Sequence, residues 1–205
     1  AISALCSNFV GGNPKKQMKD TIKPYGPLQA GKRHFFAMRN GIVADTLRRA
    51  GSPHRIIFGL NLPQIVETAS MNGFDDSLAE ALWNNTSTRE SMLLAPMVRT
   101  LETFGIEDAR RWLDIVFPIG SCEAIDVFCH RLLRHRPYAV ELAEELAGSD
   151  KAIARYTALR LMFNLYAKHT ARAAAVATTV RAIPSSLTDV LAASLVEECE
   201  LLNTL

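Results

Sequence analysis

An all-α fold, a superhelix of antiparallel helix pairs of the HEAT/armadillo kind, is predicted by three observations. From about residue 61 onward, segments with apolar residues at helical spacing follow one another, separated by proline or glycine. The expected second helices of successive pairs begin near Thr88, Gly120, Asp150 and Ser185, at spacings of 32, 30 and 35 residues, which indicates a repeat. Strand-like alternation on both sides of an Asn-Gly turn, which would indicate a hairpin, does not occur in the sequence. Stacked helix pairs curve, and their second helices line a concave face.

The composition fits one helical domain and argues against a membrane or secreted protein. The 205 residues are 48% hydrophobic, which is enough for one continuous core. No run of about 18 uncharged apolar residues is present, so we expect no membrane partner. Residues 1–8 lack the basic and apolar regions of a secretory signal. We therefore expect a cytoplasmic protein whose four cysteines are reduced and mostly buried.

The cysteine and histidine spacing does not indicate a metal site. Cys122 and Cys129 are too far apart for a C-x-x-C knuckle, and Cys129 and His130 point in different directions on a helix. The Gly11-Gly12 pair lacks the strand-to-helix setting of a phosphate-binding loop. We predict no metal and no cofactor.

Turn residues divide the chain into an N-terminal arm and a repeat domain. In residues 1–30, glycine and proline surround a short basic stretch, and we expect a loosely packed arm there. Residues 31–205 form the single HEAT-like domain. Its first element is predicted to be one long helix over residues 32–50, ended by Gly51-Ser52-Pro53.

The later helices begin at recognisable caps. Asn61 predicts a helix to about residue 71, Asp75 or Asp76 begins another that reaches Trp83, and residues 87–90 have the pattern of a capping box. The remaining predicted helices span residues 107–116, 120–134, 137–147, 150–168, 171–182 and 185–202. Trp83 and Trp112 lie at helical spacing from leucine and isoleucine, so we expect both in the core.

Two charged residues lie within the apolar second helices of the central pairs. Asp126 is five or six residues into its helix, and Arg155 has nearly the same place in the next second helix. The repeat register would bring them to the same height. Two interpretations are open: an ion pair between repeats that serves stability, or a concave-face carboxylate held by a cation. Such a carboxylate could stabilise positive charge on a ligand or orient a water molecule.

Basic residues gather at the ends of the same two helices. The clusters are Arg131, Arg134, His135 and Arg136, then Lys168, His169 and Arg172, with a further patch of Arg48, Arg49, His54 and Arg55. Cations are favoured at helix C-termini, so their role can be purely structural. Two such ends side by side would also form a stripe for a phosphate backbone. The net charge of +2 is by itself too small to indicate a nucleic-acid partner.

Four short stretches carry a family resemblance. They are Phe58-Gly59-Leu60-Asn61-Leu62-Pro63, Leu78-Ala79-Glu80-Ala81-Leu82-Trp83, Glu90-Ser91-Met92-Leu93-Leu94-Ala95 and Cys122-Glu123-Ala124-Ile125-Asp126. Together with the helix that contains Arg155, they cover roughly half the chain, over about residues 57–166. This region resembles the AlkD-like DNA alkylation repair family, which are HEAT-like alkylpurine DNA glycosylases.

The resemblance implies a concave surface that holds duplex DNA and a catalytic aspartate that works beside an arginine and two tryptophans. Asp126 matches the catalytic aspartate, whose charge would stabilise oxocarbenium character on the sugar, and Arg155 matches the arginine. Cys122 stands where the family has a tryptophan, and residues 171–182 hold no counterpart of the second one, so a cation–π contribution is missing.

Two functions follow as expectations. The first is a DNA alkylation repair-like protein that binds duplex DNA and acts as an N-glycosylase on alkylated purines, with Asp126 as the catalytic residue. The residues expected to bind DNA are Arg155, Arg131, Arg134, Arg136, Lys168 and Arg172. The alternative is a non-catalytic helical-repeat scaffold that binds a protein partner, which the near-neutral charge and the missing aromatic residues favour.

Overall fold

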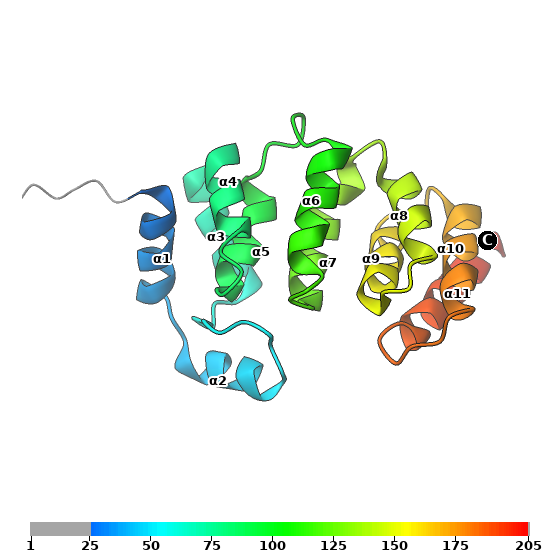
Figure 1. Cartoon of the computed structure of the whole chain (residues 1–205), viewed down its shortest axis with the longest axis horizontal. Coiled ribbons are helices and arrows are strands. Elements are labelled where there is room, and N and C mark those ends of the chain that lie inside the picture. The colour runs from blue at the N-terminus through cyan, green and yellow to red at the C-terminus, as the bar shows by residue number, and fades with distance from the viewer. Residues whose placement is uncertain (1–25, 205) are drawn as a thin grey trace, which may run out of the picture.

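The computed structural model describes residues 26–204, and this part of the chain contains eleven α-helices, one 3₁₀ turn and no strand. The all-α prediction is therefore confirmed. The helices form an arched row that follows chain order from α1 to α11 (Figure 1). Of the predicted arm over residues 1–30, only the last five residues lie within the described range, and the helix α1 (Pro27–Ala37) begins among them.

Neighbouring helices pack mainly in sequential pairs. The elements after α1 are α2 (Gly41–Arg49), α3 (Leu62–Asn72), α4 (Asp76–Trp83), α5 (Arg89–Val98), α6 (Ile106–Val116), α7 (Cys122–Arg131), η1 (Leu133–His135), α8 (Ala139–Ala147), α9 (Ala152–Phe163), α10 (Thr170–Arg181) and α11 (Asp189–Asn203). α4 packs on α5, α8 on α9 and α10 on α11, while α5, α7 and α9 contact one another in succession. This arrangement is consistent with a helical-repeat superhelix. No helix in the described range is both long and apolar enough to cross a membrane.

The predicted single helix over residues 32–50 is wrong, because the chain breaks between α1 and α2. Asn40 caps α2 by accepting a hydrogen bond from the amide of Val43 at 3.2 Å. Its own amide donates to the carbonyl oxygen of Phe58 at 2.8 Å. The apolar spacing continues across this break, and the tertiary contact with Phe58 lies 18 residues away, so the local pattern alone indicates one helix.

Gly59 permits a close approach between the segment before α3 and the start of α2. Its φ is +81°, and a Cβ there would lie 2.2 Å from the carbonyl oxygen of Asn40 and 2.8 Å from the amide nitrogen of Ala44. We expect Gly59→Ala to lower the free energy of unfolding by at least about 2 kcal/mol, because strain of about 1–3 kcal/mol adds to a backbone clash. Urea denaturation would measure this. Gly51→Ala is the matched control, because Gly51 has a φ of +85° with open space around it; equal losses would contradict a steric role for Gly59.

The helix caps at Asn61 and Asp75 are confirmed, whereas the capping box at residues 87–90 is wrong. Asn61 and Gln64 exchange reciprocal hydrogen bonds of 2.9 and 3.0 Å, and the Asp75 carboxylate accepts from the amide of Leu78 at 2.9 Å. Glu90 is fully buried and turns instead to the amides of Phe58 and Gly59, at 3.1 and 2.9 Å. Glu90, which the sequence pattern assigns to a local cap, therefore links α5 to the segment before α3 through hydrogen bonds.

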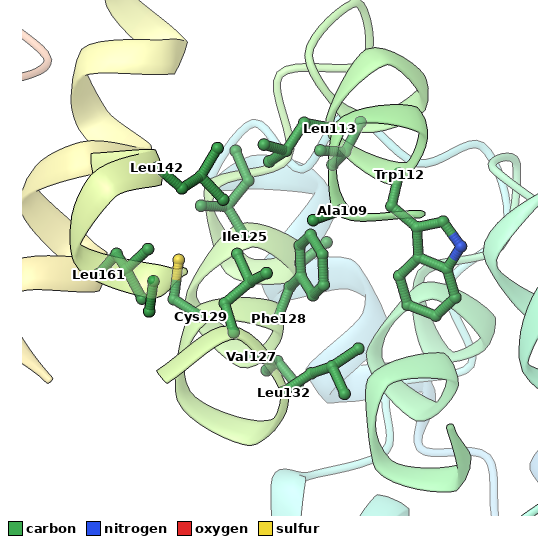
Figure 2. Packing of buried hydrophobic residues seen from close by; sticks show 14 of the residues in the cluster. Ala109, Trp112, Leu113, Ile125, Val127, Phe128, Cys129, Leu132, Leu142 and Leu161 are labelled. Atoms are coloured by element: carbon green, nitrogen blue, oxygen red, sulfur yellow. The ribbon is translucent and has the colours of Figure 1, made fainter. Parts of the chain in front are cut away.

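Trp83 and Trp112 lie in the core, as predicted. Both are fully buried, and their rings stack with centroids 4.5 Å apart and an interplanar angle of 12°. Phe128 of α7 packs against both rings. Figure 2 shows the apolar face of α7 between Trp112 of α6 and Leu161 of α9. This core fixes α7 between its neighbours and therefore fixes the side chains on its other face.

Candidate functional site

Asp126 lies at the fifth position of α7, on the face that the core leaves open. Ser121 caps the helix. Ala124, Ile125, Phe128 and Cys129 are fully buried on the opposite side. The side chain of Asp126 is 32% exposed. A carboxylate at a core-facing position would be costly to bury, but this one lies at the edge of the core and can reach solvent.

Tyr156 and Arg160 of α9 hold one oxygen of the Asp126 carboxylate. Oδ1 accepts hydrogen bonds from the Tyr156 hydroxyl at 2.8 Å and from Arg160 Nε at 2.7 Å. Oδ2 accepts no hydrogen bond from any residue in the range 26–204. The carboxylate is thus fixed in orientation by one oxygen and offers the other to a ligand or to water.

Burial raises the pKa of Asp126, although the Arg160 charge and the hydrogen bond from Tyr156 act against the rise. The same cluster raises the pKa of the Tyr156 hydroxyl, through burial and then through the negative charge of Asp126. Tyr156 therefore stays protonated at neutral pH and remains a hydrogen-bond donor. The site combines a restrained carboxylate, a phenol and a guanidinium.

The expected pairing of Asp126 with Arg155 is wrong. Arg155 is only 3% exposed, and its Nη1 donates to the carbonyl oxygens of Ser149 and Asp150 at 2.7 and 3.0 Å. It thus holds the turn between α8 and α9 and is not accessible to DNA. The cause is helix register: α9 begins at Ala152, so Tyr156 is its fifth residue, as Asp126 is in α7. Arg155 is one residue earlier, about 100° away around the helix.

Sequence reasoning missed Tyr156 and Arg160. Their spacing of four residues places them on one face of α9. Tyr156 lies six residues after the predicted helix start at Asp150, as Asp126 does after Gly120, so an equal count would align Tyr156 with Asp126. Cys122 lies one turn before Asp126 and is partly buried. Burial, followed by the charge of Asp126, raises the pKa of the Cys122 thiol, so it is a neutral thiol rather than an activated nucleophile.

Basic side chains without carboxylate partners lie at the C-terminal end of α7 and in the segments that follow α7 and α9. We call Arg131, Arg134, His135 and Lys168 the cationic surface. None of the four forms an ion pair with a carboxylate in the described range. Arg134, His135 and Lys168 line one hollow of about 260 Å³, whereas Arg131 lines a different pocket, beside α3 and α5. Partial burial, followed by the charges of Arg134 and His130, lowers the pKa of His135, as expected where positive charge is concentrated.

Two other predicted cations have different surroundings. Arg172 forms ion pairs with Glu141 and Glu144 of α8, at 3.0 and 2.6 Å, so its charge is already compensated. Arg136 is partly buried, with its guanidinium 6.0 Å from the centre of the Tyr138 ring. Neither residue therefore belongs to the cationic surface.

The patch predicted around residues 48–55 is not one open surface. His54 is buried, with Nδ1 2.9 Å from the carbonyl oxygen of Thr86 and Nε2 2.8 Å from the Ser121 hydroxyl. Arg48 forms an ion pair with Asp45. His54 instead links the segment before α3 to the start of α7. Within residues 26–204, no group of three or more metal-binding side chains is close enough together to hold an ion.

Comparison of the chain with protein-family models, curated proteins and solved structures finds no match. Functional inference therefore depends on the geometry of Asp126 and of the cationic surface.

Proposed function

We propose that the protein binds duplex DNA through the cationic surface and acts on alkylated purines as a DNA N-glycosylase centred on Asp126. One observation carries the proposal: the helix that holds a restrained carboxylate with a free oxygen, α7, ends at Arg131 and is followed by Arg134, and neither arginine has an acidic partner in the described range. Arg131 follows Asp126 by five residues, which is about 7.5 Å along the helix axis and about 140° around it, so the two side chains leave different faces of α7. By contrast, Arg110, Arg111 and Arg172 on the first helices of the pairs are all in ion pairs.

The cationic surface suits the phosphates of an alkylated nucleotide, and Asp126 suits its charged base and sugar. Phosphates would contact the cationic surface, which positions DNA without reading its sequence. A purine alkylated on a ring nitrogen is positively charged. When its bond to C1′ of the sugar breaks, the base takes the electron pair and becomes neutral, and positive charge passes to the sugar. Oδ2 of Asp126 would stabilise that charge until water adds at C1′ and loses a proton.

Arg160 and Tyr156 are positioning residues in this proposal. By binding Oδ1 they fix the direction of Oδ2, and Arg160 also favours the ionised carboxylate against the effect of burial. The positive charge of Arg160 also neutralises part of the charge of Asp126, so the free oxygen is a weaker attractor than an isolated carboxylate would be.

The salt dependence of DNA binding tests the cationic surface. Replacing Arg131, Arg134 and Lys168 together with glutamine should reduce the slope of log K against log salt by about 3, because each lost phosphate contact releases about one counterion fewer. Fluorescence anisotropy with labelled duplex DNA over a salt series would measure the slope. Arg110→Gln is the matched control, because Arg110 is already paired with Glu107 and Glu145. An unchanged slope in the triple variant, or absence of DNA binding at low salt, would contradict the proposal and favour a protein-binding scaffold.

A further inference from the structure

A pocket of about 440 Å³ opens between α3 and the end of α5, away from the Asp126 cluster. Its apolar lining consists of Val66, Ala69, Phe74, Pro96, Met97 and Leu101. A volume of this size lies within the range of small-molecule sites, which are mostly apolar and carry a few placed polar groups. The proposed DNA contact does not use this apolar volume.

Two arginines give the pocket its charge. Arg99 is buried and is held by Asp76, by Asp108 at 3.7 Å, and by the Thr103 hydroxyl at 2.7 Å. Its charge is therefore compensated, and the network fixes that wall of the pocket. Arg131 is exposed and forms no ion pair in the described range, and no carboxylate lines the pocket. One uncompensated positive charge thus borders an apolar volume.

The rim of the pocket is also apolar. Phe74, which lines the pocket, is 72% exposed. Its ring extends the mostly apolar lining that is typical of small-molecule sites. With Phe74 at its edge, the pocket would remove more of the apolar chain of a bound ligand from water.

We propose that this pocket binds a small amphipathic carboxylate, with its aliphatic chain against the apolar lining and its carboxylate on Arg131. The guanidinium matches a carboxylate because it donates two parallel hydrogen bonds. The ligand's chain is proposed to be aliphatic because the lining offers no polar side chain other than Ser70 and the two arginines. This inference does not depend on the proposed action on DNA.

Calorimetric titration with decanoate and with decanol separates the two parts of the site. The parent protein should bind decanoate more tightly than decanol. Arg131→Gln should weaken decanoate binding about 10- to 100-fold and leave decanol binding unchanged, because only the charged hydrogen bonds are lost. Ser70→Phe should weaken both ligands, because Ser70 is exposed and lines the pocket, so a larger side chain there would fill it.

Arg181→Gln is the control, because Arg181 is an exposed arginine at the far end of α10 and lies outside the pocket. It should leave both affinities unchanged, and unfolding temperatures should show that all variants are folded. Equal affinity of the parent protein for decanoate and decanol, no binding of either ligand, or unchanged binding in Ser70→Phe would overturn the proposal. No DNA is present in this titration, so its failure is distinguishable from failure of the DNA proposal.

Discussion

Asp126→Asn is expected to slow the release of methylated purine from alkylated duplex DNA by at least about 100-fold, while DNA affinity changes little. An amide has nearly the same shape as the carboxylate but cannot offer a negative charge to the developing oxocarbenium ion, and loss of one preorganised electrostatic group typically costs about 10² to 10³ in rate. The measurement is single-turnover base release, compared with binding of the same duplex.

The matched control is Asp114→Asn, because Asp114 is an exposed aspartate on the neighbouring helix α6. It should release base at the parental rate. Base release by Asp126→Asn at the parental rate would show that Asp126 is not the catalytic acid. Intact DNA binding without release by the parent protein would instead indicate a protein that recognises lesions without excising them.

The pH dependence of release gives a further test of the same residue. Because burial raises the pKa of Asp126, the ionised form is lost at a higher pH than for an exposed aspartate. Release should therefore decline as the pH falls through this raised pKa and should recover on return to neutral pH. The residual activity of Asp126→Asn should lack this acidic limb. Since the fold favours the uncharged acid relative to the unfolded chain, a neutral asparagine is expected to be tolerated.

Arg89→Met is expected to lower the free energy of unfolding by about 3–5 kcal/mol, because it leaves a buried carboxylate without its counter-charge. Glu90 is fully buried and forms its ion pair with Arg89 at 3.0 Å. The remaining donors to Glu90 are the amides of Phe58 and Gly59. Arg89 also donates to the carbonyl oxygen of Leu60 at 3.0 Å, so its loss leaves this oxygen without that donor as well. Urea denaturation followed by circular dichroism would measure the change.

Arg110→Met provides the comparison, because Arg110 pairs with two carboxylates, as Arg89 does with Glu90 and Glu123, but is exposed to solvent. It should lose only a small fraction of the stability that Arg89→Met loses. Adding Glu90→Gln to Arg89→Met should restore part of the loss, because the unpaired charge is removed. Similar losses in the two arginine variants, or no recovery in the double variant, would show that the buried charge is not the cause.

Features set by nearby residues could be predicted from the sequence, and features set by distant contacts could not. The caps at Asn61 and Asp75 involve partners three residues away, and both predictions are confirmed. Glu90 has the spacing of a capping residue, but it binds amides 32 and 31 residues earlier in the chain. A local pattern does not show whether a buried carboxylate will find a better donor elsewhere.

The contacts of the candidate site also depend on distant residues, and an error of one residue on a helix changes which side chain is selected. Asp126 lies six residues after the predicted helix start at Gly120, whereas Arg155 lies only five residues after the predicted start at Asp150. Treating the two positions as equivalent selects Arg155, which is buried, in place of Tyr156 and Arg160, which contact Asp126. Likewise, an arginine near a helix end is predicted to be available, yet Arg172 pairs with Glu144, 28 residues earlier. Periodicity predicts which face is apolar, whereas availability of a charge depends on its tertiary neighbours.

The stacked pair of Trp83 and Trp112 has a consequence for how unfolding would be observed. These are the only two tryptophans in the chain, and their rings are 4.5 Å apart. Tryptophan fluorescence therefore originates from one point in the middle of the helical row, whereas far-ultraviolet circular dichroism sums over every helix. If α1 and α2, or α10 and α11, fray before the centre, ellipticity will fall while the emission maximum stays where it is. A gap between the two melting curves would then measure how far the ends of the row unfold independently of its middle.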